Sequence, residues 1–287
     1  MEDSPRRSCF MINTKHILIL AAVSFILLLS GCPGPIKPVT PDVITRGKGD
    51  IRSAVASLEK HKAGVKPVRA SGKLKYVYYK DGKKTEENPD LQLAFSPPNN
   101  LFFRARVLGI EVLRLGSNDQ EFWFLMPPQE ISEYYWGKWD QLKGCKNNLL
   151  ISPRNILDAL GMVTVDQSWL LIEDKGQDVL VKLGDNGKMT RRIYIDRSTY
   201  LPTRIEYLDD HELEKVGINL SDYRPIADGS PVPAKIDITT INIGEVTSRI
   251  EIKLNNPTFL KPEKIGKRTF VMPTPKGFKH VKKICGD

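Results

Sequence analysis

The chain has 287 residues, of which 40% are hydrophobic and 27% are charged, so it can bury a core and is not disordered overall. Its 43 basic and 34 acidic residues leave a formal charge of +9, which favours anionic partners such as anionic lipid, acidic polysaccharide or nucleic acid. The absence of a collagen-like period, a sustained heptad or a repeat of about 20–50 residues excludes fibres and solenoids.

Residues 1–31 have the organisation of a secretory signal peptide. An apolar run of thirteen residues, Ile17–Leu29, follows Lys15, and it is too short to cross a bilayer, which takes about 20 residues. The run ends in Leu29-Ser30-Gly31-Cys32, which resembles the lipobox of bacterial lipoproteins. This resemblance implies lipidation of Cys32 and a lipid anchor in the cell envelope. An ordinary secretory signal with a chance cysteine is the alternative.

Residues 32–50 are predicted to be the lipidated cysteine and a proline-rich linker. The stretch from Pro33 to Pro38 stays extended and solvated, which suits a tether. Pro33 stands where the inner-membrane retention signal of some bacteria has aspartate, so we expect the periplasmic face of the outer membrane. Cys145 and Cys285 then lie in an oxidising compartment and could form a disulfide, with two free buried thiols as the alternative.

From residue 51 to 287 the chain is expected to form one domain that begins with a helix and continues as strands. Apolar residues recur at helical spacing over 51–62, and Gly64 and Pro67 stop the helix. Hydrophobic residues then alternate with a period of two, and Asp81-Gly82 predicts a hairpin turn. The strands expected in this part centre on residues 73–78, 91–95, 101–107, 112–116, 122–126 and 130–136.

A second helix is expected at residues 152–161, with Ser152 as its N-cap and Gly161 at its end. Strands resume at 169–173, 178–183, 190–196, 202–208, 213–222, 234–242 and 246–254. About 11–13 antiparallel strands with two helices and no βαβ alternation predict a mainly β fold, a curved sheet that forms a single open antiparallel β-barrel. Helices that plug its concave face would enclose a container for a hydrophobic ligand.

Motifs of catalysis and metal binding are not found in the sequence. It has no Gly-x-Ser-x-Gly, Walker, Gly-x-Gly-x-x-Gly or His-Glu-x-x-His pattern, and His61, His211 and His280 are isolated. The segment Asp209–Glu212 is interpreted as a solvated turn rather than a metal site. We therefore expect no enzyme, no metal and no cofactor, although carboxylates could still converge in three dimensions. Export disfavours nucleic acid as a partner.

One region of the chain is rich in aromatic residues and another is rich in basic residues, and each has alternative interpretations. Residues 101–139 hold nine of the 23 aromatic residues, and Phe122-Trp123-Phe124 places rings on both faces of one strand. These rings are either sheet core, or the lining of a cavity or a membrane-facing rim. Residues 261–287 contain eight basic and two acidic residues, a net charge of +6. This basic C-terminal extension is either drawn to anionic lipid or a solvated tail.

Three stretches resemble the LolA/LolB lipoprotein-localisation superfamily, and most closely its LolB branch of outer-membrane lipoproteins. Leu101–Leu115 resembles the family's strand, Leu-Gly turn and strand, with Val107 where the family often has proline. Ser152–Gly161 resembles its Pro-opened helix that ends in Leu-Gly. Pro233–Ile238 followed by Ser248–Leu254 resembles its final strand pair, so the resemblance covers most of residues 51–256.

The resemblance implies an open barrel, plugged by helices, that binds acyl chains or lipidated proteins and acts in lipoprotein localisation, with a LolA-like periplasmic carrier among its partners. A leucine in the family's protruding Leu-Gly turn helps deliver lipoproteins into the membrane, and Leu108 and Gly109 match it here. Leu108 as an ordinary hairpin residue is the alternative.

Strand alternation and the second helix together predict which residues would line the acyl-chain cavity, provided the strand register does not slip. They are Leu93, Phe95, Phe103, Ala105, Leu113, Leu115, Phe122, Phe124, Ile156, Leu157 and Leu160. A structural envelope lipoprotein that uses the same sheet for protein or cell-wall contacts is the alternative function. An envelope hydrolase on an unfamiliar scaffold is the third hypothesis.

Overall fold

The computed structural model describes residues 50–80, 83–127, 132–142, 152–174, 176–242, 245–266 and 268–284. The signal peptide, Cys32 with most of the linker, and the cysteine pair Cys145 and Cys285 lie outside the described residues. Contacts divide the chain into Met1–Thr45 and Arg46–Asp287, and every described residue belongs to the second unit. This unit has a hydrophobic core of its own, which is what independent folding requires.

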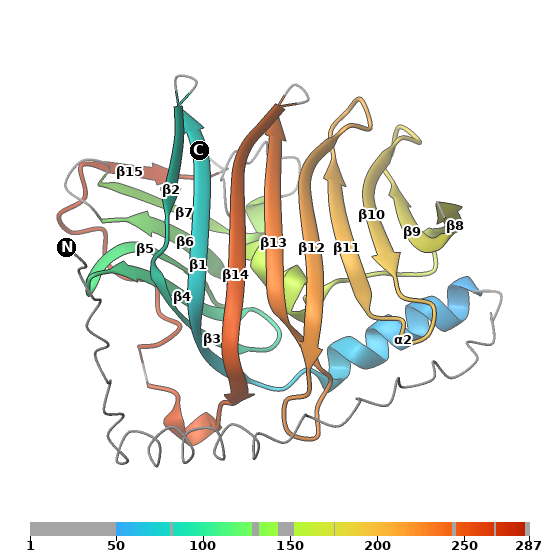
Figure 1. The fold of residues 1–287 in the computed structure, drawn as a ribbon, viewed down its shortest axis with the longest axis horizontal. Coiled ribbons are helices and arrows are strands. Elements are labelled where there is room, and N and C mark those ends of the chain that lie inside the picture. The colour runs from blue at the N-terminus through green and yellow to red at the C-terminus, as the bar shows by residue number, and fades with distance from the viewer. Residues whose placement is uncertain are drawn as a thin grey trace, which may run out of the picture. The chain divides into compact units, whose positions relative to one another are not determined.

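One sheet of fifteen strands makes up most of this unit (Figure 1). The strands follow one another in space in the order β15-β7-β6-β5-β4-β3-β1-β14-β13-β12-β11-β10-β9-β8, with β2 paired to β1. Their bounds are β1 Val68–Lys80, β2 Lys83–Glu87, β3 Asp90–Ser96, β4 Asn100–Val107, β5 Ile110–Ser117, β6 Glu121–Met126, β7 Glu133–Lys138, β8 Leu170–Asp174, β9 Gln177–Leu183, β10 Met189–Ile195, β11 Pro202–Leu208, β12 Glu214–Arg224, β13 Val232–Asn242, β14 Glu245–Phe259 and β15 His280–Lys283.

The predicted fold class is confirmed, because the sheet is curved and its path does not close into a ring. Two details of the prediction were wrong. The sheet has fifteen strands rather than 11–13, since β2 and β15 were not foreseen, and β15 pairs with β7 in parallel rather than antiparallel. The strand expected at 130–136 occupies Glu133–Lys138.

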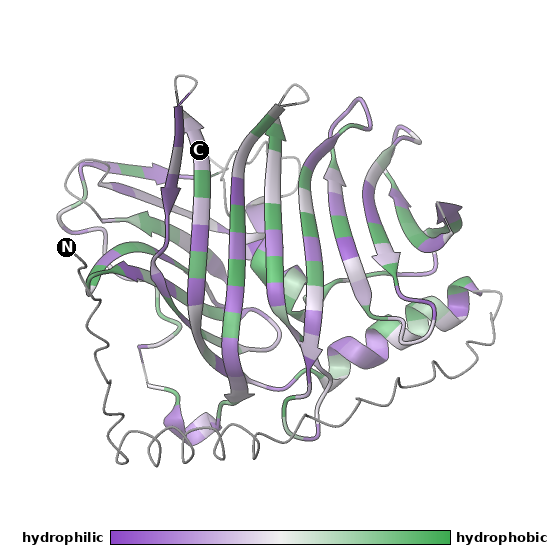
Figure 2. Ribbon diagram, viewed as in Figure 1, coloured by the Kyte–Doolittle hydropathy of each residue, from purple (hydrophilic) through white to green (hydrophobic). Residues whose placement is uncertain are grey.

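Alternation along the strands explains why the sheet forms and which side it buries. The residues of β4 are alternately buried and half-buried from Leu101 to Arg106, and Figure 2 shows the same alternation of hydropathy along β13 and β14. A sheet of this size curls rather than staying flat. In Figure 1 the strands β8–β14 and β1 stand side by side, whereas β4–β7 run across behind them.

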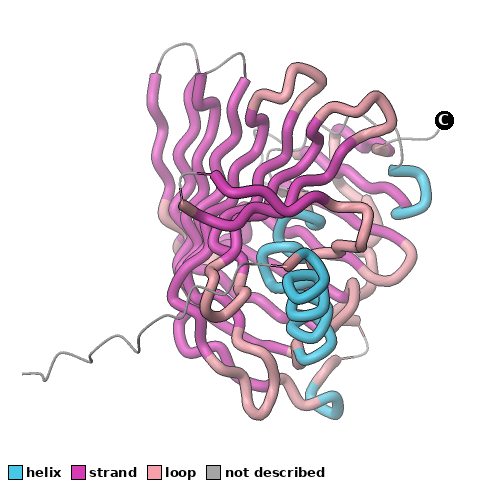
Figure 3. The backbone as a smooth tube through the Cα atoms, turned by 90° about the vertical axis from the view of Figure 1, so that its right-hand side faces the viewer, coloured by secondary structure: helices cyan, strands magenta, loops and turns pink. Residues whose placement is uncertain are grey.

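Two helices lie on the concave side of the sheet, which curves around them in Figure 3. The first, α2, spans Ile51–Gly64. The second, α3, spans Pro153–Leu157 and continues as a π-helical turn, η2, over Asp158–Met162. Two 3-10 turns complete the elements, η1 over Trp139–Leu142 and η3 over Pro262–Lys264. Within the described ranges, no helix has the length and apolar character needed to span a membrane.

Both predicted helices are confirmed, with ends set by local chemistry. The hydroxyl of Ser152 accepts a hydrogen bond of 3.2 Å from the backbone N–H of Arg154, as an N-cap should. Asp50 precedes α2 without a side-chain cap hydrogen bond. Gly161 ends the second helix with φ of 98°, and a Cβ atom there would lie 2.9 Å from His61 Nε2. Glycine suits this position because it adopts a positive φ without strain and has no Cβ atom that would collide with the His61 ring.

The C-terminal segment packs on the outer face of β6 and β7. Met272 and Phe278 contact a buried cluster formed by Trp123, Leu125 and Tyr134. The hydroxyl of Tyr134 donates a hydrogen bond of 2.7 Å to the Pro273 carbonyl, and β15 extends the sheet beside β7. The ring of Trp123 on the second face of β6 is therefore covered by the chain's own C-terminus rather than facing a cavity or a membrane. The described part of this basic extension is thus held on the sheet by these contacts, and its described lysines and arginine are exposed.

Removing the Phe278 ring is expected to loosen this C-terminal cover. Its ring lies 5.3 Å from that of Tyr134 in an edge-to-face arrangement. Phe278→Ala should therefore lower the free energy of unfolding by about 1–2 kcal/mol, measured by urea denaturation. Val281→Ala on the same segment is the control, because Val281 is 47% exposed and should change stability by only about 0.5 kcal/mol. Equal losses in both variants would contradict the packing role of Phe278.

Candidate functional site

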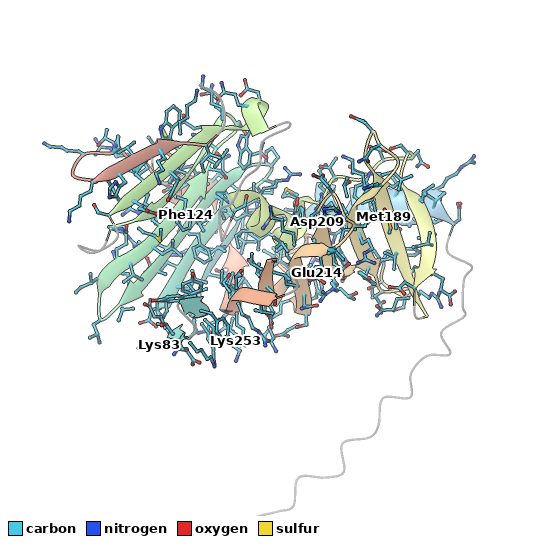
Figure 4. The ribbon with its side chains drawn as sticks, turned by 90° about the horizontal axis from the view of Figure 1, so that it is seen from above. Lys83, Phe124, Met189, Asp209, Glu214 and Lys253 are labelled. Carbon is cyan, nitrogen blue, oxygen red and sulfur yellow. The ribbon has the colours of Figure 1, made fainter. Side chains whose placement is uncertain are left out.

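The concave face between β3 and β6 carries aligned rows of apolar side chains. Leu93, Phe103, Leu115 and Phe124 are register partners on four successive strands, so they form one row across the sheet. Ala105 and Leu113 pair in the next row, and Phe122 lies on the same face of β6 as Phe124. Because antiparallel partners lie about 4.5–5.5 Å apart, each row is a continuous apolar surface. Figure 4 labels Phe124 on this half of the sheet.

The second helix places three apolar side chains against this surface. Ile156, Leu157 and Leu160 are fully buried in the same core as the rows of β3–β6. Of the eleven residues predicted to line a cavity, ten are at most 4% exposed, and Leu113 is partly buried against the core. Phe122 stacks on Trp139 with ring centroids 4.9 Å apart. The structure thus brings ten of the eleven into one core or against it, whereas Phe122 contacts Trp139 at the edge of that core.

The other half of the sheet supplies lining residues that the sequence analysis did not select. One row crosses six strands from β9 to β14, and its members are all buried: Leu180, Ile193, Ile205, Ile218, Ile238 and Ile250. Their alternation was visible in the sequence, because each strand there was predicted. Their common row was not, since it depends on how six separate strands align. The apolar concave surface is therefore about twice as wide as predicted, covering both halves of the sheet.

A buried polar cluster connects the second helix to the sheet. Asp158, at the start of η2, is fully buried and lies 2.7 Å from the guanidinium of Arg191 on β10. Tyr207 on β11 donates a short hydrogen bond to the same carboxylate oxygen, and Arg154 pairs with the other at 3.2 Å. The rings of Tyr207 and Trp169 flank Arg191 at 4.8 and 5.9 Å. The cluster thus holds the helical plug in one position.

The electrostatics of this cluster favour charged Arg191 and neutral Tyr207. Burial lowers the pKa of Arg191, but the Asp158 carboxylate and Tyr207 outweigh it and hold the pKa above its ordinary value. Burial, with Asp158 beside it, raises the pKa of the Tyr207 hydroxyl. Asp158, Arg191 and Tyr207 are far apart in the chain, so no sequence pattern marked them.

Lowering the pH is expected to destabilise the fold through His61, a buried residue of α2. Burial lowers the pKa of His61 from 6.5, and its Nε2 has no hydrogen-bond partner. Below pH 6.5 the unfolded chain binds a proton that the folded chain does not, so stability falls until the folded-state pKa is reached. In His61→Phe this part of the loss should be absent.

Urea midpoints of both proteins, measured from about pH 7.5 to 5, test this prediction. His211→Phe is the control, because His211 lies in an exposed turn and its substitution should leave the pH dependence unchanged. A slope that stays the same in His61→Phe would contradict the prediction.

The turn between β4 and β5 exposes apolar residues. Leu108 and Gly109 form its tip with φ of 49° and 84°, as in the two-residue turns that join twisted strands. Leu108 is 97% exposed and Ile110 is 71% exposed. Exposure of these apolar side chains to water is unfavourable, and packing against the rest of the fold does not compensate for it. The structure therefore places the predicted Leu-Gly turn at a protruding tip.

The histidine turn has the structure that was predicted for it. The Asp209 carboxylate accepts backbone hydrogen bonds from His211 at 2.8 Å and Leu213 at 3.0 Å, so it stabilises the turn. In the described part of the chain, no group of three or more His, Cys, Asp or Glu side chains is placed to hold a metal ion.

Together these features define a class of protein: an open antiparallel half-barrel whose apolar concave face is closed by two helices. This arrangement agrees with the open barrel, plugged by helices, that the sequence resemblance implied. No family model matches the sequence, and no curated protein matches it.

Several solved structures are similar to the chain at low sequence identity. A LolA superfamily protein from Nitrosomonas europaea is 9% identical with a TM-score of 0.48, over 77% of this chain and 97% of its own. A domain from Vibrio parahaemolyticus described as outer membrane lipoprotein-sorting is 10% identical with a TM-score of 0.49, over 76% and 95%. A DUF1329 family protein from Desulfovibrio piger is 11% identical with a TM-score of 0.47, over 77% and 96%.

Proposed function

We propose that this protein is a non-enzymatic, membrane-anchored lipoprotein of the cell envelope that binds acyl chains on the concave face of its sheet. The observation that carries the proposal is the broad apolar surface formed by buried rows on β3–β6 and β9–β14, which belong to one core and are covered, among the described residues, by two helices. Each CH₂ group of an acyl chain that enters such a surface gains about 0.8 kcal/mol over water.

Binding requires the helical plug to move, because the lining residues already pack against it. The two helices are attached differently: α2 buries only four side chains, Ala54, Val55, Leu58 and His61, whereas the second helix is buried along most of its length and is held by the Asp158 cluster. The second helix contains a π-helical turn, a feature that concentrates at functional sites. Elements with few buried apolar contacts open at the lowest free-energy cost. An acyl chain would therefore enter where α2 opens, and it would lie on the rows of β3–β6 beside Ile156, Leu157 and Leu160.

The membrane contacts of the proposed function lie at two places. Lipidation of Cys32 would anchor the chain at the periplasmic face of the outer membrane, with the proline-rich linker as a tether. The exposed tip at Leu108 and Gly109 would enter the same bilayer when cargo is passed on. In this role the protein accepts lipids or lipidated proteins, with a LolA-like carrier as the donor, and takes part in lipoprotein localisation.

Native mass spectrometry of residues 46–287, expressed in a bacterial periplasm, tests the proposal. The segment is suitable because it has its own core. The proposal predicts lipid or lipopeptide adducts that disappear on denaturation and whose masses identify the cargo. A clean apo mass, together with no uptake of a fluorescent fatty acid, would overturn it.

The second candidate is a structural envelope lipoprotein that uses the sheet for protein or cell-wall contacts. It is favoured by one observation, that ten of the eleven predicted lining residues are at most 4% exposed. A core filled by its own side chains needs no ligand. This candidate predicts the clean apo mass and pull-down of an envelope partner by the lipidated chain.

A further inference from the structure

Three arginines lie close together on the outer face of the sheet, at the base of the β4–β5 turn. Arg104 on β4 and Arg114 on β5 are direct register partners, and Arg106 follows two residues later on the same face of β4. All three are half-buried, and Arg104 lies over the Phe102 ring at 5.3 Å. Residues on the opposite face of these strands, such as Phe103 and Ala105, point into the core.

The negative charge on this face does not balance the arginines. Glu111 pairs with Arg114 at 2.7 Å, whereas Arg104 bonds to the neutral side chain of Gln92. Arg106 has no ion pair among the described residues, and the nearby carboxylate of Asp90 is taken by Lys73. The three arginines and Lys73 therefore share two carboxylates, Glu111 and Asp90, which are the register partners of Arg106 on its two neighbouring strands.

This arrangement is costly in the protein alone. Like charges directly opposite one another on antiparallel strands destabilise a sheet. The Nε atoms of Arg104, Arg106 and Arg114 are all buried without a hydrogen-bond partner, and each unsatisfied donor adds to the cost. Burial lowers the pKa of Arg104, and the charges of Arg106 and Arg114 lower it further. An anion with several oxygen atoms would relieve both costs, since phosphate binds guanidinium groups through paired hydrogen bonds.

The position of the cluster indicates which anion it meets. Arg106 is adjacent to Val107, at the start of the apolar tip, and Arg104 lies about 13 Å from Leu108 at about 3.3 Å per residue. A segment that buries its apolar residues about 5–10 Å deep at a bilayer surface brings its flanking residues to the level of the phosphates. Basic residues at that level are attracted to anionic leaflets.

We propose that Arg104, Arg106 and Arg114 form a binding surface for the phosphates of anionic phospholipids while the Leu108 tip enters the bilayer. The inference rests on the proposed function only for the contact between the tip and the membrane; it does not depend on acyl-chain binding. The surface would orient the half-barrel so that the β4–β5 end faces the bilayer.

Vesicle sedimentation with residues 46–287 tests the proposal. The probes are vesicles of phosphatidylcholine alone and with about 30 mol% phosphatidylglycerol. Binding should be at least about tenfold tighter to the anionic vesicles, and Arg104→Gln/Arg114→Gln should weaken that binding by about 30-fold while leaving the zwitterionic vesicles unaffected. Equal binding of the unmodified protein to both vesicles would overturn the proposal.

The double variant Lys235→Gln/Lys253→Gln is the matched control. These two lysines are also register partners on adjacent strands, and their substitution removes the same charge, but both are exposed. Figure 4 labels Lys253. The control should weaken anionic binding by less than about threefold. Equal losses in the two double variants would show general charge attraction and overturn the proposal.

Three further measurements separate this inference from its alternatives. Leu108→Glu should abolish binding to both vesicles, and the arginine variant should keep its fatty-acid uptake and have a urea midpoint no lower than that of the unmodified protein. If the protein takes up no fatty acid but binds anionic vesicles through the arginines, the proposed function fails and this inference stands.

Replacing chloride by inorganic phosphate at constant ionic strength should leave vesicle binding within about threefold. Abolition of vesicle binding by phosphate would identify free phosphate as the ligand and overturn the lipid assignment.

Discussion

Asp158→Ala is expected to lower the free energy of unfolding by about 3–5 kcal/mol, the cost of leaving a buried charge without its partner. Asp158 is fully buried, and the side chain of Arg191 is only 12% exposed. Removing the carboxylate leaves the Arg191 guanidinium desolvated, with Tyr207 deprived of its acceptor. Urea denaturation followed by circular dichroism would measure the loss.

Two comparisons show whether burial causes the effect. Asp222→Asn also removes the charge of an arginine-paired carboxylate while keeping a side chain that tolerates the positive φ of this residue, and the Asp222 and Arg224 side chains are 51% and 46% exposed, so the loss should stay below about 1 kcal/mol. Asp158→Leu combined with Arg191→Met should recover most of the stability, because the uncompensated charge is gone. A double variant as unstable as Asp158→Ala would show that the cluster acts through packing instead.

Leu160→Asp is expected to lower the free energy of unfolding by about 4–5 kcal/mol and to weaken fatty-acid binding by at least about tenfold. Leu160 is fully buried among the residues of the second helix and the sheet, so an aspartate there places a carboxylate against apolar side chains. Thermal melting and titration with a fluorescent fatty acid give the two readouts. Unchanged melting and unchanged affinity would contradict the placement of Leu160 at the site.

Leu213→Asp and Leu160→Ala complete this test. Leu213 is 59% exposed, so its substitution should change neither readout beyond about 0.5 kcal/mol in stability. Leu160→Ala removes packing without adding a charge, and it should cost about 2–5 kcal/mol while fatty-acid affinity stays within about threefold. A cavity lined by apolar groups still accepts an apolar ligand. Loss of binding in Leu160→Ala as large as in Leu160→Asp would therefore indicate unfolding rather than a changed site.

The strands that the sequence failed to predict have no apolar alternation. Lys83–Glu87 is charged along its length, and only Thr85 is half-buried. Every residue of His280–Lys283 is exposed. Both segments are strands because a neighbouring strand supplies hydrogen-bond partners, which is a property of the sheet rather than of their own side chains. The strands with clear alternation, such as Asp90–Ser96, were predicted close to their observed bounds.

The residues of the candidate site also divide into those that the sequence predicted and those that it missed. Alternation identified the buried face of β3–β6, because a period of two assigns each residue to one side without knowledge of its partners. The Leu108 turn was predicted from the family resemblance of Leu101–Leu115 and not from alternation. The buried ion pair of Asp158 and Arg191 and the arginines opposed across β4 and β5 were missed. Both clusters form between residues of separate elements, so they could be found only once the pairing of those elements was known.

By itself, the sequence determined the mainly β class, the two helices and the inward face of β3–β6, because propensity, capping and alternation act over a few residues. Only the tertiary structure decided the register that aligns six isoleucine and leucine residues across β9–β14, and the packing of Phe278 over the outer ring of Trp123. Both depend on contacts between segments far apart in the chain. Such contacts form when burial of the whole surface outweighs the entropy of closing the loops between them, a balance that no short stretch of sequence contains.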